Sequence, residues 1–148
     1  MKHSGPWLAA GLLIVGMQLT ACQRPVVKHE AEHPAEVEAV EGSDLSRVTL
    51  TEKAAARIDL KTTPVREQRM SRSALPRKVV PHSALIYGPQ GETWIYTSPQ
   101  PRTFIRYKVD VDYVEGDLVV LNDGPPAGTV VASVAVAQLY GTEFGVGH

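Results

Sequence analysis

The residues best suited to metal chemistry are two histidines close to the N-terminus. His29 and His33 are four positions apart, with Glu30 and Glu32 between them. On a helix this spacing brings both imidazoles to one face, where they can bind Zn²⁺ or Cu²⁺. Pro34 disfavours a helical conformation at His33, however, and two imidazoles fill only half of a tetrahedral site. The sequence therefore predicts a solvated tether and no cofactor, with weak Zn or Cu binding by the pair as the alternative.

Thiol chemistry is confined to Cys22, the single cysteine of the chain. A lone cysteine cannot form an internal disulfide and makes a poor metal cage. It follows a positive start at Lys2 and His3, an apolar run over 7–15 and small residues over 19–21. This order is typical of a bacterial export signal, and the apolar run is shorter than the 20 or so residues of a membrane span.

The four residues Leu19-Thr20-Ala21-Cys22 resemble the lipobox of bacterial lipoproteins. The resemblance implies that residues 1–21 are a signal peptide removed before Cys22, and that Cys22 is acylated as a lipid anchor. Several acyl chains bind a membrane far more firmly than one. The protein is then expected on the periplasmic side of the cell envelope, at the inner or the outer membrane. The alternative is a cleaved secretory signal with an incidental cysteine.

Candidates for catalysis are weak. His82 and Ser83 are adjacent, and neighbours on a strand point to opposite faces, so they cannot readily share a proton. No nucleophile elbow, P-loop or dinucleotide fingerprint occurs. The acidic residues near the C-terminus do not have calcium-loop spacing and fall on a polar strand face or in turns. They are Asp110, Asp112, Glu115, Asp117 and Asp123. The sequence therefore predicts a protein that is not an enzyme.

A basic cluster lies within residues 66–78, and after Glu67 no acidic residue occurs until Glu92. Near a membrane such a cluster attracts anionic headgroups, and it can equally meet an acidic patch on a partner subunit. A solvated loop is the alternative. The formal net charge of −1 argues against a nucleic-acid partner. The cluster consists of Arg66, Arg69, Arg72, Arg77 and Lys78.

The elements that must position these residues begin after a polar segment. Residues 22–45 are rich in Glu, His, Ala, Val and Pro without a core-forming period and predict a flexible tether. From residue 46 to 148 short apolar runs alternate with turn residues, and Thr51 can cap a short helix over 52–58. Strands are expected over 46–50, 59–65, 82–87, 93–97, 105–113, 118–122 and 129–141, the last ending in a helical turn. The predicted fold class is mostly β, a small barrel or sandwich of six to seven short strands with one short helix.

The clearest periodicity lies in residues 105–113. Apolar side chains alternate there with Arg106, Lys108, Asp110 and Asp112. This period of two predicts a strand with one buried and one solvated face, the charged residues lying on the solvated face. On the preceding predicted strand, Trp94 and Tyr96 are expected to be core residues because large aromatics bury the most area in a small domain.

Three stretches resemble the periplasmic adaptor subunits, or membrane fusion proteins, of resistance-nodulation-division efflux pumps. They are "VTLTEKAAARIDLKTTPV", "VPHSALIYGPQGETWIYT" and the segment from "VDVDYVEGD" to "TEFG", together about residues 46–145. A full adaptor inserts a barrel, a lipoyl-like domain and a long helical hairpin between the first two stretches. Here only "REQRMSRSALPRKV" separates Val65 from Val80. The chain thus looks like the membrane-proximal domain of an adaptor without the inserted barrel, lipoyl-like domain and helical hairpin.

The resemblance implies an envelope lipoprotein that acts as an accessory or truncated adaptor-like subunit, by binding and without catalysis. Its expected partners are the membrane and an efflux pump or a full-length adaptor, and metal ions are one candidate cargo. The alternative function is a stand-alone periplasmic lipoprotein that binds metal or a small ligand through its His- and Glu-containing tether. A remnant without pump contact is a third hypothesis.

Overall fold

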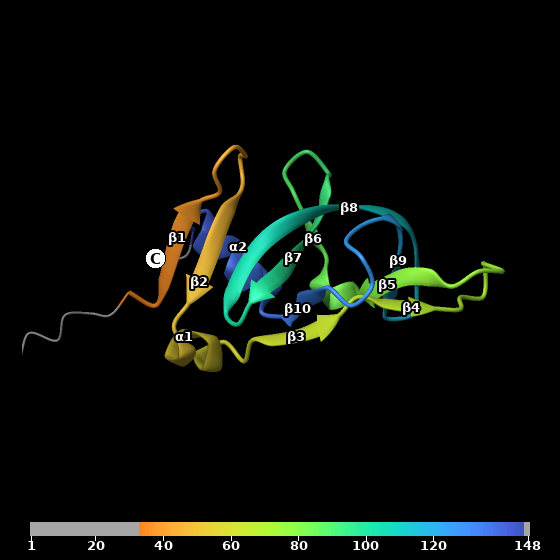
Figure 1. Cartoon of the computed structure of the whole chain (residues 1–148), viewed down its shortest axis with the longest axis horizontal. Helices are drawn as coiled ribbons and strands as arrows, with labels where there is room; N and C mark the ends of the chain where they lie inside the picture. Colours follow the sequence, from red (N-terminus) through yellow and green to blue (C-terminus); the bar gives the residue numbers. More distant parts are fainter. Residues whose placement is uncertain (1–32, 147–148) are drawn as a thin grey trace, which may run out of the picture. The chain divides into compact units, whose positions relative to one another are not determined.

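The computed structural model describes residues 33–146 as a mostly β domain, which confirms the predicted fold class (Figure 1). The predicted signal peptide, Cys22 and His29 lie outside the described residues. The strands are β1 (Ala35–Ala39), β2 (Ser46–Leu50), β3 (Lys61–Pro64), β4 (Arg66–Gln68), β5 (Arg77–Pro81), β6 (Ile86–Tyr87), β7 (Thr93–Gln100), β8 (Thr103–Glu115), β9 (Leu118–Asp123) and β10 (Val130–Val134). The helices are α1 (Glu52–Arg57), the 3₁₀ turn η1 (His82–Ala84) and α2 (Val136–Glu143).

The strands form one curled sheet in the order β3-β10-β7-β8-β9-β5-β4, with β1 and β2 added beside β8 and β6 beside β7. The two ends of this order, β3 and β4, are separated in the chain only by Val65. The N–H of Val65 donates to the carbonyl of Thr129 at 2.8 Å, and Val65 itself is buried. The sheet therefore curls until its first and last strands meet at a single residue.

Successive residues of the central strands face two different apolar clusters. On β7, Ile95 lies in the first cluster and Tyr96 in the second; on β10, Val131 and Ala132 divide in the same way. Side chains in a strand alternate between faces, so the sheet separates the two clusters. The first cluster fills the inside of the curl and contains Val65, Val80, Ala84, Ile95, Val109, Val119, Leu121 and Val131. The second lies under α2 and contains Val48, Leu50, Tyr96, Phe104, Ala132, Val136 and Leu139.

The early and late parts of the domain share this sheet. β2 pairs antiparallel with β8, with Val48 opposite Phe104, and β3 pairs antiparallel with β10, with Thr63 opposite Val131. Residues 46–65 and 80–140 therefore contribute strands to the same sheet and side chains to both of its apolar clusters. Burying apolar surface between them stabilises the fold by about 25 cal/mol per Å².

Helix α1 begins where the sequence predicts. The N–H of Ala54 donates to Oγ1 of Thr51 at 3.1 Å, which satisfies one of the free donors of the first turn. Helix α2 is entered through Ala135, whose φ of 66° is left-handed. Within residues 33–146, no helix is both long enough and apolar enough to cross a bilayer.

Three strands were not predicted, and two predicted segments differ from the structure. Residues 35–39 lie in the expected tether, yet they form β1 because β2 offers a free edge to pair with. The segment after Val65, for which a solvated loop was the alternative, forms the β4–β5 hairpin. Residues 82–87 were predicted as one strand, but residues 82–84 turn as η1 after Pro81, and only β6 pairs as a strand.

Candidate functional site

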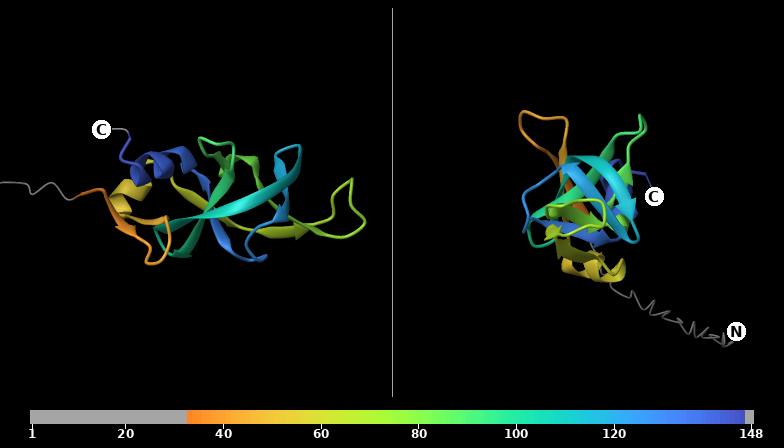
Figure 2. Two further views of the ribbon diagram at one scale, coloured as in Figure 1. Left: turned by 90° about the horizontal axis from the view of Figure 1, so that it is seen from above. Right: turned by 90° about the vertical axis from the view of Figure 1, so that its right-hand side faces the viewer.

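The predicted basic cluster is carried by the β4–β5 hairpin, which projects from the curled sheet (Figure 2). The strands pair antiparallel, with Arg66 opposite Val79 and Gln68 opposite Arg77, and β5 pairs in turn with β9. The hairpin therefore extends the sheet beyond β9.

Apolar contacts and a polar contact fix the base of the hairpin. Met70, which is buried, packs with Val79 and Val120 in a third apolar cluster. Beside it, the hydroxyl of Ser71 donates to the carboxylate of Glu115 on β8. The connection after β4 is thus held against the sheet at Met70, and only the residues beyond it form the exposed tip.

Two of the five basic residues bind the domain itself. The Arg77 Nη2 atom lies 2.9 Å from Oδ2 of Asp112 and 3.1 Å from Oδ1 of Asn122. The ammonium of Lys78 donates to the carbonyl of Gly124 at 2.6 Å. Arg77 and Lys78 therefore fasten β5 to the β8–β9 region, and their charges are partly used there.

The other three basic residues, Arg66, Arg69 and Arg72, are exposed. The guanidinium of Arg72 lies over the ring of Tyr113, 4.3 Å from its centroid, a cation–π contact. Arg66 and Arg69 are exposed and have no ion pair among residues 33–146. We call Arg66, Arg69 and Arg72 the basic hairpin surface. Three exposed positive charges on or next to the ordered hairpin are suited to an anionic partner.

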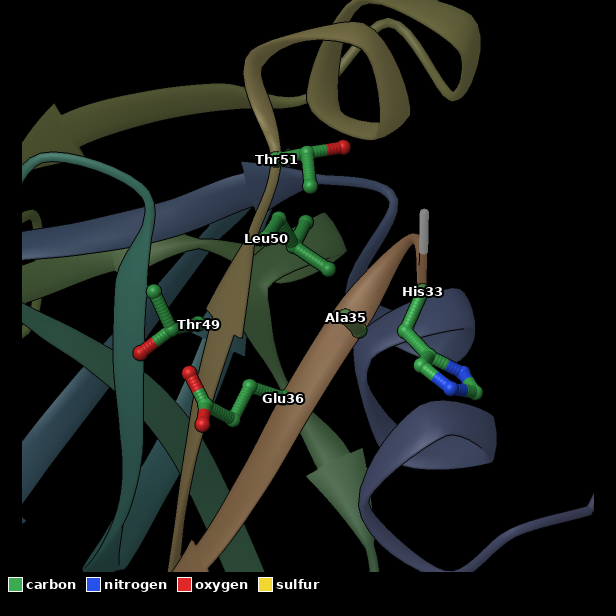
Figure 3. A pocket seen from close by; sticks show the side chains of 6 residues that line it. All are labelled: His33, Ala35, Glu36, Thr49, Leu50 and Thr51. Carbon is green, nitrogen blue, oxygen red and sulfur yellow. The ribbon is translucent and has the colours of Figure 1, made fainter. Parts of the chain in front are cut away.

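The predicted metal pair is placed only in part. His29 lies outside the described residues, and His33 is exposed just before β1. Figure 3 shows the imidazole of His33 beside α2 and the carboxylate of Glu36 on the other side of β1, next to Thr49. The two side chains therefore do not converge on one ion. Within residues 33–146, no three His, Cys, Asp or Glu side chains are grouped as metal ligands would be.

The histidine, serine and acidic residues that could serve catalysis do not form one site. His82 and Ser83 are both exposed on η1. Asp112 and Glu115 bind Arg77 and Ser71, respectively. These contacts give the two carboxylates structural roles in holding the hairpin.

A buried polar cluster that the sequence did not predict joins β7, β8 and α2. The Nε atom of Arg106 donates to both carboxylate oxygens of Glu143, at 2.9 and 2.8 Å. The hydroxyl of Tyr96 donates to Oε2 of the same carboxylate at 2.6 Å. The side chains of Arg106 and Glu143 are only 10% and 2% exposed. The prediction that Arg106 lies on a solvated face is wrong, because α2 covers that face of β8 at this point.

Aromatic rings enclose the same arginine. Its guanidinium carbon lies 4.6 Å from the ring centroid of Trp94 and 4.9 Å from that of Phe144. Burial, and then the hydrogen bond to Glu143, raise the pKa of Tyr96, which therefore stays protonated as a donor. Tyr96 is fully buried, as predicted, whereas Trp94 is only partly buried. The carboxylate of Glu143 is bound by side chains of β7 and β8, so the cluster anchors α2 to the sheet.

Comparison with protein-family models and with curated proteins gives no match for this chain.

Proposed function

We propose that the protein is a lipid-anchored envelope subunit that works by binding, as an accessory or truncated adaptor-like component of a resistance-nodulation-division efflux system. Its anchor is Cys22, and its partner is a pump or a full-length adaptor. The partner-binding element is the basic hairpin surface of Arg66, Arg69 and Arg72.

The observation that carries this proposal is the way the chain returns to the sheet. β3 and β10 pair on one side of Val65, β4 and β5 pair on the other, and β2 joins β8. A domain built from two separate stretches of chain can exchange the connection between them without losing its core, because the two ends already lie together. The resemblance described above implies this arrangement for an adaptor domain without its arm.

The charge distribution of the hairpin supports binding through this element. Arg66 and Arg69 are exposed and are not neutralised by an ion pair within residues 33–146. Met70, which follows them in the chain, is buried and holds this part of the hairpin against the sheet. Positive charge on an ordered element steers and orients a negatively charged partner at little cost in conformational entropy. An acidic surface on a pump or adaptor subunit has the complementary chemistry.

Recovery of the full-length lipoprotein from cell membranes tests the proposal. The protein carries a C-terminal tag, is solubilised in non-ionic detergent after cross-linking, and its partners are identified by mass spectrometry. We expect a resistance-nodulation-division pump or adaptor to be enriched. The double variant Arg66→Glu/Arg69→Glu should lose most of this enrichment and remain in the membrane fraction.

The matched control is Arg57→Glu/Arg102→Glu, which reverses two exposed arginines outside the hairpin. It should recover the same partner as the wild type. Recovery of no pump or adaptor by the wild type contradicts the proposal. If, in addition, Zn²⁺ titration shifts only the NMR signals of His29 and His33, the metal-binding alternative is favoured.

A further inference from the structure

Strand β1 has a free edge. The Val40 N–H donates to the Leu45 carbonyl at 2.9 Å, and the Thr51 N–H donates to the Pro34 carbonyl at 3.0 Å. Hydrogen bonding alternates along an antiparallel ladder, so the even-numbered residues of β1 bond to β2 and the odd-numbered ones face away. No other described strand pairs with this side of β1. The outward-facing residues are Ala35, Val37 and Ala39.

An apolar groove of about 860 Å³ runs beside this edge, between β1, α1 and α2. Helix α2 presents small residues to it at Ala137 and Gly141, and Val37 on β1 is 43% exposed. A strand added to β1 would direct every second side chain into this space. The groove therefore has room for apolar side chains next to unpaired backbone donors and acceptors. Its apolar lining includes Ala35, Val37, Ile58, Ala137 and Val146.

The opposite face of the same edge is acidic. Glu36 and Glu38 lie there, opposite Thr49 and Arg47 of β2. Only Glu38 has a basic neighbour, with its carboxylate 3.5 Å from Nη1 of Arg47, and both of these side chains are about half exposed. Figure 3 shows Glu36 on the side of the strand away from His33 and α2. A second strand would meet this negative face with its other set of side chains.

We propose that the free edge of β1 binds an extended segment of a partner protein in which apolar residues alternate with lysine or arginine. The apolar set enters the groove beside α2, the basic set faces Glu36 and Glu38, and the backbone pairs with the odd-numbered residues of β1. A second copy of β1 does not fit, because antiparallel pairing about Val37 would set Glu36 opposite Glu38 of the other copy. This site is separate from the basic hairpin surface, at the other end of the sheet (Figure 1).

Fluorescence anisotropy of the full chain in non-ionic detergent tests the site. The probe is a short capped peptide in which valine and lysine alternate, and its control has the same composition with the lysines in one block. We expect saturable binding of the alternating peptide and about tenfold weaker binding of the blocked one, since only alternation separates the two faces. Equal binding of the two peptides contradicts the proposal.

The contribution of backbone pairing is tested at Val37. Val37→Pro removes an N–H that faces away from β2, and proline is tolerated on the free side of an edge strand. It should weaken binding about tenfold, whereas Val37→Thr, which keeps the N–H, should remain near the wild type. Unchanged affinity in Val37→Pro would overturn the proposal.

The charge-reversed variant Glu36→Lys/Glu38→Lys should invert the preference. It should bind a peptide of alternating valine and glutamate about tenfold more tightly than the valine–lysine peptide. A misfolded protein would bind neither peptide, so an inverted preference shows that the variant is folded. Sedimentation that reveals a dimer abolished by Val37→Pro would show that a second copy occupies the edge, which contradicts the proposal. None of these outcomes depends on the partner of the basic hairpin surface.

Discussion

Arg106 on β8 holds the carboxylate of Glu143 at the end of α2 with two hydrogen bonds, although 37 residues separate them in the chain. Both side chains are nearly inaccessible to solvent. The contact connects a long central strand to the last helix, and Tyr96 on β7 adds a third element to it. The position of α2, and hence one wall of the groove beside β1, depends on this pair.

Removing one member of the pair should destabilise the domain strongly. Glu143→Leu leaves the Arg106 guanidinium buried without its carboxylate, and such losses cost about 3–5 kcal/mol. We expect a decrease of about 3 kcal/mol in the free energy of unfolding, measured by urea denaturation. The double variant Arg106→Met/Glu143→Leu should lose less than the sum of the single variants. Glu41→Gln, at an exposed carboxylate, should stay within about 0.5 kcal/mol of the wild type. Additive single losses would contradict the coupling.

Alkaline pH should reveal the burial of Tyr96. Its pKa is raised in the folded protein, so above about pH 10 the unfolded chain releases a phenolic proton that the folded chain keeps. The free energy of unfolding should then fall as pH rises, by about 1.4 kcal/mol per pH unit from this group. Tyr96→Phe should be about 2 kcal/mol less stable near pH 8, because a hydrogen bond to a charged acceptor is lost. In Tyr96→Phe, the free energy of unfolding should also fall less steeply with pH above about pH 10, because the group that causes this part of the fall is absent.

The measurement is the difference in urea stability between the wild type and Tyr96→Phe from about pH 8 to about pH 11. This difference should shrink as pH rises. Tyr87→Phe, at a tyrosine that is 59% exposed, is the matched control and should keep the full wild-type slope. A constant difference between the wild type and Tyr96→Phe would show that Tyr96 does not carry the effect.

The cap of α1 should make a measurable contribution. Thr51→Ala removes the oxygen that accepts the N–H of Ala54 and should lower the free energy of unfolding by about 1 kcal/mol. Thr51→Ser keeps an accepting hydroxyl and should recover most of the loss. Equal losses in the two variants would mean that the methyl group, and not the hydrogen bond, is responsible.

The anchoring hypothesis is tested at Cys22. We expect Cys22→Ala to leave the membrane fraction and enter the soluble periplasm, or to keep its signal peptide uncut. Fractionation and the mass of the mature chain distinguish these forms from the wild type, for which cleavage before Cys22 and added acyl mass are expected. Cys22→Ala that stays in the membrane with normal processing would rule out the lipid anchor.

The sequence predicted best where one local rule acts alone. Thr51 caps a helix because its hydroxyl and the following residues suffice to form that turn, and the alternation over 105–113 identifies most of β8. The segment over 35–39 was missed as a strand because its burial is slight and its stability comes from pairing with β2, which lies in another part of the chain.

Arg106 illustrates the other limit. A period of two separates the faces of β8, but it does not say which face is solvated at each position. The face that carries Arg106 also carries Phe104, which is fully buried under α2. Only the later chain, with Glu143 in its last helical turn, supplies the partner that makes a buried guanidinium acceptable. A solvated loop was one reading of residues 66–78, but the pairing of β4 with β5 was not predicted.

The tip of the hairpin beyond Met70 is also a position where the chain can accept an insertion. β4 and β5 hold both of its ends in register, and Met70 closes the base, so extra chain inserted there would not disturb either apolar cluster of the curled sheet. Loop-closure entropy grows slowly, by about 0.6 kcal/mol for each doubling of length. Whole modules could therefore be grafted onto this hairpin, or trimmed from it, while the barrel-like body keeps its shape.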